Sequence, residues 1–468
     1  MLLVHKIPII GLLLIVITTL ITEWCIRHQK LNIFIARKIL HVVAIGTCSY
    51  VIYSSGSMQY LPAIFLCSSI ILGIVVYKKK LQSSSISNSY GIALFPFAFF
   101  LLLQCNLFTT VQVAISATTL TFADALAGLV GYYFGKIKMV FLQEQKSVLG
   151  FFVFYSTSVI IYSCFYGLGA WQLALLYGIV PALSELFSYR GSDNLCVPIA
   201  ACCWAYLLQQ SDIQSLYTSA IYMVALLPLA YIALRKCWLT PTAIIAALYL
   251  AINILFYGGL LYFVPMVVFF IVGSIITFAT KKKKLFAIEK SKARTATQVF
   301  VNGGVAVVCM VLYNITSNNM YAIAYLASIA ISLTDTVSSE VGTYYGHKTY
   351  DVFTMKKIHA GLSGGVSIIG TVAGIVTAIL FGGLAYFLFA ISVVQVSIVI
   401  LLGIIGMLVD SMLGSTLQAK YRNYYGSMVE YKTPYVIRGY KWCTNNVVNL
   451  LSNTFTIFTL IVVYYFLR

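Results

Sequence analysis

Two acidic residues stand in apolar stretches of the chain and share one spacing to glycine. Asp124 is followed seven positions later by Gly131, and Asp335 is followed seven positions later by Gly342, with a further glycine four residues after each. Asp124 has no cation next to it in the sequence. A carboxylate in the hydrocarbon region of a membrane is costly and marks a functional site by default. The shared spacing therefore predicts two related active sites.

Basic and small polar residues in the first half have the chemistry of a phosphate site. The spacing of Arg37, Lys38 and His41 places them on one helix face. The alternative interpretation is a stop-transfer flank with an unrelated histidine. A helix that starts at Ser147, after Lys146, would offer free backbone amides to an anion, and an ordinary helix start is the alternative. The binding candidates of this half are Arg37, Lys38, His41, Gly131, Lys146, Ser147, Gly150 and Asn194.

Three carboxylates of the first half could hold a metal ion or a proton. Glu185 ends one apolar run, and Asp193 and Asn194 follow in a predicted loop before a helix that begins near Pro198. Mg²⁺ prefers oxygen ligands and takes part of its shell from water and substrate phosphates. The catalytic candidates are therefore Asp124, Glu185 and Asp193, with Asp124 and Glu185 as the metal ligands. A plain surface loop remains the alternative for residues 185–194.

The second half offers a richer set of the same residue types. Its catalytic candidates are Asp335, Glu340 and Asp410, with Asp335 and Asp410 as metal ligands. A glycine cluster after Lys357 is predicted to open the helix 364–382, where the missing side chains would let a phosphate approach the backbone. The binding candidates are Arg294, Gln298, Asn302, Ser338, Gly342, Lys357, Gly361, Gly364, Gly365, Ser411, Gln418, Asn445 and Asn446.

Transmembrane helices must position these residues. Hydrophobic residues make up 61% of the 468-residue chain and charged residues 9%, whereas soluble proteins carry about a quarter charged residues. Long apolar runs between short polar loops indicate helices, since barrel strands would show alternation. We expect an all-α polytopic protein of about 16 spans, within a range of roughly 13–16, two of them near 242–258 and 260–279. The eleven cysteines show no zinc-ligand spacing and fit buried free thiols.

The net charge of +18 would suggest nucleic acid binding if the basic residues were spread evenly. With the predicted spans in place, all basic residues except Lys6 and Arg468 fall on one side, which the positive-inside rule makes cytoplasmic. We therefore expect no nucleic acid partner. Residues 7–22 are expected to remain as a helix rather than a cleaved signal peptide. The lack of a transit-peptide pattern favours a bacterial inner membrane over a plastid, with the active sites on the cytoplasmic face.

The two motifs divide the chain into related halves. We assign residues 1–215 to the first membrane domain, 216–239 to a connecting span and 240–468 to the second. Five features follow one another in the same order in each half. They are a basic helix start, an acid followed by two glycines, a basic loop that leads into a helix opened by glycine, a second acid, and an asparagine. Five features in one order indicate a gene duplication.

These motifs resemble two families of isoprenoid kinases. Residues 30–210 resemble the phytol kinase and dolichol kinase family, CTP-dependent polyprenol kinases related to CDP-diacylglycerol synthase, through Arg37-Lys38-Ile-Leu-His41, Ala123-Asp124-Ala-Leu-Ala, Lys146-Ser147-Val-Leu-Gly150, Glu185 and Gly191-Ser-Asp193-Asn194. Residues 240–468 look like the phytyl-phosphate kinase family, which includes transmembrane protein 19, through Arg294, Gln298, Asn302-Gly303, Asp335-Thr336, Ser338-Ser-Glu340-Val-Gly342, Gly364-Gly365-Val-Ser367, Asp410-Ser411, Gln418 and Asn445-Asn446-Val-Val-Asn449.

The chain departs from these families at a few positions. Ala123 stands where phytol kinases usually have glycine, and Thr334 and Val337 replace residues that are commonly Ala and Trp. His359 and Leu362 stand where Pro and Thr are common, so the backbone is a better phosphate ligand there than a side chain. The Pro-Gly-His-Gly-Gly run of cytidylyltransferases is absent from both halves.

The resemblance implies a bifunctional kinase with CTP as phosphoryl donor and Mg²⁺ as cofactor. The first half would phosphorylate a prenol of the phytol or geranylgeraniol type, with Asp193 or Asp124 accepting the alcohol proton. The second half would convert the monophosphate to the diphosphate. The expected partners are membrane lipid, the isoprenoid alcohol, its phosphate and CTP, and a homo-oligomer stays open. A cytidylyltransferase forming a CDP-lipid and a membrane transporter are the alternatives; a transporter would place its charges near the membrane centre rather than at helix ends.

Overall fold

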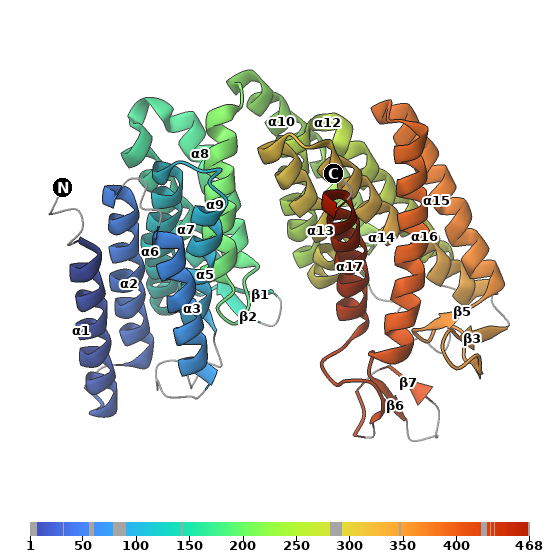
Figure 1. Cartoon of the computed structure of the whole chain (residues 1–468), viewed down its shortest axis with the longest axis horizontal. Helices are drawn as coiled ribbons and strands as arrows, with labels where there is room; N and C mark the ends of the chain where they lie inside the picture. Colours follow the sequence, from blue (N-terminus) through green and yellow to red (C-terminus); the bar gives the residue numbers. More distant parts are fainter. Residues whose placement is uncertain are drawn as a thin grey trace. The chain divides into compact units, whose positions relative to one another are not determined.

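The structure is a computed structural model that describes residues 7–30, 32–55, 60–77, 90–141, 144–280, 293–345, 348–422, 428–430, 432–434 and 436–466. The chain divides into two compact units, 1–213 and 214–468 (Figure 1). Ten helices of the described residues are long and apolar enough to cross a membrane, which confirms the all-α transmembrane class, whereas the number of spans stays a prediction. Lys6, Gly346, Arg468 and the basic run 281–284 lie outside the described residues.

Unit 1 is organised around one buried helix, α6. This helix carries small residues such as Ala114 and Ala117 in the core, which lets α2, α7 and α9 pack closely around it. Phe99 and Phe154 fill the space beside it. The elements of the unit are α1 (Ile7–Arg27), α2 (Ile33–Ser55), α3 (Leu61–Tyr77), α5 (Gly91–Gln104), α6 (Thr110–Phe134), β1 (Lys138–Phe141), β2 (Glu144–Ser147), α7 (Val148–Tyr166), a 3₁₀ turn (Leu168–Ala170), α8 (Trp171–Leu186) and α9 (Asp193–Gln210).

Unit 2 has the same plan around α14, with additional strands gathered at one end of its helices (Figure 1). Helices α12, α13, α15, α16 and α17 pack around α14. The elements are α10 (Ile213–Ala225), α11 (Leu227–Arg235), α12 (Pro241–Thr280), α13 (Ala296–Thr316), α14 (Asn319–Tyr345), β3 (Thr349–Asp351), β4 (Lys357–Ile358), β5 (Gly365–Val366), α15 (Ile368–Phe389), α16 (Val393–Thr416), β6 (Lys420–Arg422), β7 (Met428–Val429), β8 (Val436–Arg438) and α17 (Asn445–Phe466).

One helix crossing is built in the same way in both units. Ser147 caps α7 by accepting a hydrogen bond from the Gly150 backbone N–H (2.9 Å), and Ser367 caps α15 by accepting one from the Gly370 N–H (3.2 Å). A Cβ on the motif glycine of α6, Gly131, would lie 2.5 Å from the Ser147 hydroxyl. The equivalent Cβ on α14 would lie 3.0 Å from the Ser367 hydroxyl. These glycines therefore let the two helices approach each other closely.

One feature was not predicted from the sequence, and two local predictions are wrong. The feature that was not predicted is an antiparallel hairpin of β1 and β2, in which Lys138 pairs with Ser147. Residues 361–365 form a turn and β5 rather than a helix start, because Gly361 (φ 93°) and Gly364 (φ 78°) adopt a left-handed backbone that a right-handed helix excludes. Helix α9 begins at Asp193 rather than near Pro198, since an acid is stabilised at a helix N-terminus.

The two spans expected at 242–258 and 260–279 correspond to the two helical arms of α12, which meet at a break at Gly259. Gly259 has non-helical angles (φ 76°, ψ −178°) and separates two apolar arms. A residue with a side chain would be strained in this conformation. The break gives α12 two helical segments, both of which line the apolar groove described below.

Candidate active sites

The acid of the first motif is paired with two basic residues from α2. The Lys38 Nζ lies 2.8 Å from Asp124 Oδ2, and His41 Nε2 lies 3.3 Å from the same oxygen. Lys38 also donates to the Asp124 backbone carbonyl (3.1 Å), and Gly128 leaves the space that its ammonium group occupies. Asp124 is buried. Lys38 thus neutralises a carboxylate that has no cation beside it in the sequence, and His41 lies next to the same oxygen.

A second ion pair of unit 1 joins the β-hairpin to α8. Lys146 Nζ lies 2.5 Å from Glu185 Oε1 and donates to the Ser188 hydroxyl (3.1 Å). Burial opposes the charged form of Lys146, but the carboxylates of Glu185 and Asp193 outweigh it and raise the pKa of this lysine. The hairpin that the sequence did not predict is therefore what delivers Lys146 to the acids.

Two neighbouring oxygen acceptors beside these acids find no hydrogen-bond donor among the described residues. Asp193 Oδ1 and Asn194 Oδ1 are buried and accept no hydrogen bond from any described residue. The charge of Asp193 interacts with those of Asp124, Lys146 and Lys38, so these groups form one electrostatic cluster. Buried acceptors without donors are rare and need an explanation, such as a ligand.

The other candidates of unit 1 lie around this cluster. Arg37 is half-buried on α2, next to Lys38 in the chain. Gly131, Ser147 and Gly150 meet at the crossing of α6 and α7, where they pack against one another. The Ser147 hydroxyl accepts a hydrogen bond from the Gly150 N–H as the helix cap, so an anion would have to displace this oxygen to bind the Gly150 amide.

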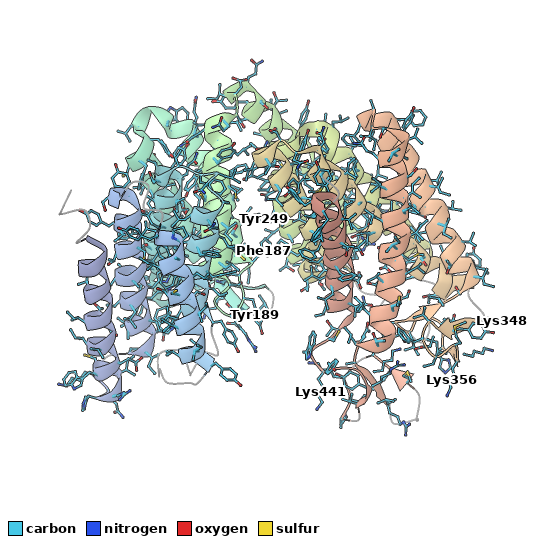
Figure 2. The ribbon with its side chains drawn as sticks, viewed as in Figure 1. Phe187, Tyr189, Tyr249, Lys348, Lys356 and Lys441 are labelled. Atoms are coloured by element: carbon cyan, nitrogen blue, oxygen red, sulfur yellow. The ribbon has the colours of Figure 1, made fainter. Side chains whose placement is uncertain are left out.

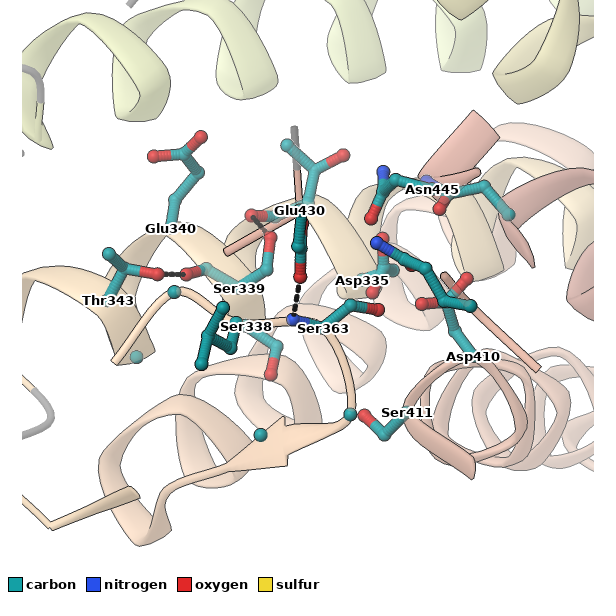
Figure 3. A pocket seen from close by; sticks show the side chains of 18 of the residues that line it. Asp335, Ser338, Ser339, Glu340, Thr343, Ser363, Asp410, Ser411, Glu430 and Asn445 are labelled. Atoms are coloured by element: carbon teal, nitrogen blue, oxygen red, sulfur yellow. Dashed lines mark hydrogen bonds between the residues drawn. The ribbon is translucent and has the colours of Figure 1, made fainter. Parts of the chain in front are cut away.

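Unit 2 contains a cavity of about 720 Å³ that is lined by most of its predicted site residues (Figure 3). Only Lys357, which lies exposed in β4, is absent from the lining among the candidates of this half. The candidates that line the cavity are Arg294, Gln298, Asn302, Asp335, Ser338, Glu340, Gly342, Gly361, Gly364, Gly365, Asp410, Ser411, Gln418, Asn445 and Asn446.

The charged groups of this lining are mainly acidic. Among the described residues, four carboxylates line the cavity (Asp335, Glu340, Asp410 and Glu430), together with two cations (Arg294 and Lys432). Figure 3 shows Asp335 and Asp410 on the side of Asn445, and Glu340 on the other side of the cavity beside Thr343. An anionic substrate would therefore meet net negative charge unless a cation accompanies it.

Hydroxyl groups hold two of these carboxylates. Ser452 donates to Asp410 Oδ2 (3.0 Å), and Thr280 donates to Glu340 Oε2 (2.6 Å). Two buried amide oxygens on the lining, Gln418 Oε1 and Asn449 Oδ1, accept no hydrogen bond from any described residue. The cavity therefore presents carboxylates and free amide oxygens together, which is the donor set of an oxygen-rich cation site.

Sequence reasoning missed the residues that come from the strand end of unit 2. Glu430 accepts a hydrogen bond from the Ser363 backbone N–H and so fixes the glycine turn over the cavity (Figure 3). Lys432 lines the cavity from the same strand end, and Ser339 and Thr343, which were also not predicted, line it from α14. The signal for Glu430 and Lys432 in the sequence was the hydrophilic loop 420–441, whose residues carry no periodic pattern.

A buried polar network fixes this strand end. Asp351 accepts hydrogen bonds from the Ser415 hydroxyl (2.9 Å) and the Thr354 backbone N–H (2.9 Å), and the ammonium group of buried Lys420 lies 3.6 Å away. Burial alone would raise the pKa of Asp351, but the hydrogen bonds from Thr354 and Ser415 and the charge of Lys420 lower it to about 2. The network joins β3, the end of α16 and β6 beside the cavity.

The second unit of the chain matches a known family of membrane proteins. The family model described as Integral membrane protein DUF92 matches residues 224–457, half of the chain, and this segment contains the whole cavity lining. The chain belongs to the DUF92 integral membrane family. Residues 1–223, which include the acidic cluster of unit 1, lie outside the DUF92 segment.

Three relatives are similar to part of this chain. Uncharacterized membrane protein sll0875 of Synechocystis is 30% identical over 236 residues (49% of this chain, 83% of the relative), and uncharacterized membrane protein MJ0933 of Methanocaldococcus jannaschii is 28% identical over 216 residues (45% and 88%). Protein VTE6, chloroplastic, of Arabidopsis thaliana is 27% identical over 198 residues (41% of this chain), so the chain spans about half (54%) of VTE6. No solved structure matches the chain.

The two units differ in how well they fit Mg²⁺. No group of three or more His, Cys, Asp or Glu side chains suited to a metal occurs among the described residues, but Mg²⁺ in phosphoryl-transfer sites needs only one or two carboxylates plus phosphates. The DUF92 cavity fits this pattern through Asp335, Asp410 and its free amide oxygens. In unit 1, lysine ammonium groups occupy Asp124 and Glu185, so this pair does not fit a metal in the arrangement found.

Proposed function

We propose that this protein is a membrane-embedded isoprenoid kinase whose second unit phosphorylates a prenyl monophosphate to the diphosphate. The observation that carries the proposal is the acid-rich cavity of about 720 Å³ with its unpartnered amide oxygens. The distant homology to VTE6, together with the resemblance of residues 240–468 to phytyl-phosphate kinases, supports a prenyl-phosphate-kinase-like function.

The electrostatics of the cavity favour a substrate that arrives with divalent cations. The described lining carries four carboxylates and two cations, so its net negative charge would repel a nucleoside triphosphate that carries no metal ion. Mg²⁺, when bound, would neutralise charge on the transferred phosphoryl group and align donor and acceptor. Asp335 and Asp410, with the amide oxygens of Gln418 and Asn449, are the residues we assign to hold it.

The protein's own contribution in unit 2 is to position two phosphates. The turn at Gly361–Gly365 lies on the cavity lining and is fixed by the hydrogen bond from Ser363 N–H to Glu430, and we assign its backbone to the donor phosphates. Arg294 Nη2 donates weakly to the Thr277 hydroxyl (3.4 Å), and we assign its guanidinium to the acceptor phosphate. No general base is required there, because the acceptor phosphate is already an anion.

For unit 1 we propose phosphorylation of a prenol, with CTP as the donor that the family resemblance implies. Lys38 and Lys146 are the cations available to the phosphates. Asp124 Oδ2 is engaged by Lys38 and His41, so the unpartnered Asp193 Oδ1 is the group we assign to accept the alcohol proton. The protein would then carry out two successive phosphorylations, as expected for a fusion of two kinases.

We place the active sites on the cytoplasmic face of a bacterial inner membrane. Figure 2 shows Lys348, Lys356 and Lys441 at the strand end of unit 2, and the cavity is lined by residues from the same strands and turns. Positively charged loops remain in the cytoplasm, where a soluble nucleotide is available. The tail of the substrate would stay in lipid while its head group meets the nucleotide.

The test uses purified protein in detergent with Mg²⁺ and CTP and follows the lipid products over time. Geranylgeraniol should give the monophosphate and then the diphosphate, with CDP released, and geranylgeranyl phosphate supplied directly should give the diphosphate. Formation of a CDP-lipid with pyrophosphate would contradict the kinase proposal in favour of cytidylyl transfer. Absence of turnover with CTP, ATP, GTP and UTP would contradict both enzyme assignments.

A further inference from the structure

An apolar groove adjoins the polar cavity of unit 2. It has a volume of about 110 Å³ and lies between α11, both arms of α12 and α13. Apart from three residues, Arg294, Gln298 and Asn302, its described lining is entirely apolar, with Ala230 and Ala247 on two of its walls. The same three polar residues line the polar cavity as well. The groove and the cavity therefore meet at a single polar junction.

The junction is held in place by its surroundings. The Arg294 backbone exchanges hydrogen bonds with the segment before α12, through Arg294 N–H to the Trp238 carbonyl (2.9 Å) and Thr240 N–H to the Arg294 carbonyl (3.0 Å). Its guanidinium carbon lies 5.9 Å from the centre of the Phe269 ring, which lines the groove. Gly273 leaves space for the guanidinium, since a Cβ there would lie 3.0 Å from Nη2.

The groove lies at the apolar periphery of unit 2. Helix α11 forms one wall and also exposes Leu227 and Ile232, with exposed fractions of 53% and 46%. The stretch from Ile213 to Arg235 is apolar enough to cross a membrane. An apolar groove beside a helix with exposed apolar residues suits a hydrocarbon chain, and a half-buried cation at its polar end, Arg294, suits an anionic head group.

We propose that this groove is the tail subsite for the prenyl monophosphate, and this inference rests on the proposed function of unit 2. The isoprene units nearest the head group lie between α11, α12 and α13, and the phosphate lies at Arg294, Gln298 and Asn302, facing the nucleotide in the polar cavity. Small side chains at Ala230 and Ala247 keep the groove open. They make the groove a determinant of acceptor chain length.

The experiment compares Ala230→Trp with Ile232→Trp, a control on the same helix whose side chain is exposed and does not line the groove. Initial rates are measured with geranylgeranyl phosphate and with the five-carbon dimethylallyl phosphate. Ala230→Trp should raise KM for the long acceptor roughly tenfold, the effect of displacing about two methylene groups from an apolar site, and change KM for the short acceptor little. Ala247→Phe should act in the same direction from the opposite wall.

A photo-crosslinking readout separates failure of the groove from failure of the kinase. A diazirine-tailed analogue of geranylgeranyl phosphate should label peptides of α11–α13 in the full-length protein, and geranylgeranyl phosphate should compete. Equal KM values for the Ala230→Trp and Ile232→Trp variants, with kinase activity intact, would overturn the groove and leave the proposed function standing. Competed labelling without turnover on any nucleotide would support the groove and contradict the kinase. Labelling confined to other helices would overturn the tail subsite.

Discussion

The two units contain the same type of helix crossing, but the candidate sites next to the crossing differ in their electrostatics. In unit 1, lysine ammonium groups lie 2.8 Å from Asp124 and 2.5 Å from Glu185. In unit 2, hydroxyl groups donate to Asp410 and Glu340, and six amide side chains among the described residues belong to the cavity lining. A carboxylate already bonded to an ammonium group attracts a further cation weakly. Unit 1 is thus organised around cations of the protein, and unit 2 is suited to cations that arrive with a substrate.

The scaffold explains why such different sites can share a plan. The capping serines Ser147 and Ser367 and the glycines opposite them fix how the acid-bearing helix meets the next helix. The groups that decide the chemistry lie on other elements, since Lys38 comes from α2 and Lys146 from the β-hairpin. Exchange of those elements changes the electrostatics while the crossing stays the same.

The largest expected effect is the selective loss of one of the two phosphorylation reactions when the acid of one site is replaced. Asp335→Asn should lower conversion of prenyl monophosphate to diphosphate about 10³-fold, because it removes a charge assigned to the metal and phosphates, and leave prenol phosphorylation unchanged. Asp193→Asn should have the reverse pattern, because it removes the carboxylate assigned to accept the alcohol proton in unit 1. Rates with each acceptor supplied separately measure both reactions. Loss of both reactions in either single variant would show that the two units do not act independently.

The next effect is on stability and belongs to unit 1. Lys38→Met leaves the buried Asp124 carboxylate without its closest cation and should lower the free energy of unfolding by about 3–5 kcal/mol. The double variant Lys38→Met/Asp124→Asn removes both charges and should recover most of this loss. Thermal unfolding in detergent of the three proteins provides the measurement. A single variant as stable as the parent would mean that the ion pair does not form.

The sequence was sufficient to predict the membrane class and the polar candidates of unit 2, nearly all of which line the cavity. Asp335, Asp410 and Asn445 lie near the ends of apolar helices, and the length of an apolar run locates such ends well. Lys357 was predicted beside them because it precedes the glycine cluster in the chain. The structure places it in β4, because the backbone turns at Gly361 and Gly364 instead of entering a helix.

Contacts between distant residues could not be predicted. Lys38 and Asp124 are 86 positions apart, and no local pattern indicates that α2 packs against α6 in the register that joins them. Glu430 lies beside a two-residue strand, which is too short to show alternation. Such features depend on tertiary packing, so the electrostatic difference between the units emerged only from the structure.

Low pH should reduce the stability of unit 2, because protonation of Asp351 weakens the polar network at its strand end. Its pKa in the folded protein, about 2, lies below the ordinary value of 3.8, so the stabilisation is present above pH ~4 and is lost as the pH falls through 2. The difference corresponds to about 2 kcal/mol. Asp351→Asn should lose this part of the pH dependence, which thermal unfolding between pH 5 and 2 would measure against the parent. Identical pH profiles would contradict the role of Asp351.

The smallest expected effect is the difference in stability cost when the glycine at each helix crossing is replaced by alanine. A Cβ at Gly131 would lie 2.5 Å from the Ser147 hydroxyl, whereas one at Gly342 would lie 3.0 Å from the Ser367 hydroxyl. Gly131→Ala should therefore cost about 1–3 kcal/mol through overpacking, while Gly342→Ala should cost less than about 1 kcal/mol, because the gain in helix propensity offsets a milder clash.

A second substitution tests the cause of this difference. Ser147→Gly removes the hydroxyl that the new Cβ would meet and weakens the helix cap by only a few tenths of a kcal/mol. In Gly131→Ala/Ser147→Gly the stability measured by thermal unfolding should therefore return close to that of Ser147→Gly alone. If Gly342→Ala proves as costly as Gly131→Ala, the crossing of α14 with α15 is as tight as that of α6 with α7, and the two units then differ only in the groups that surround their acids.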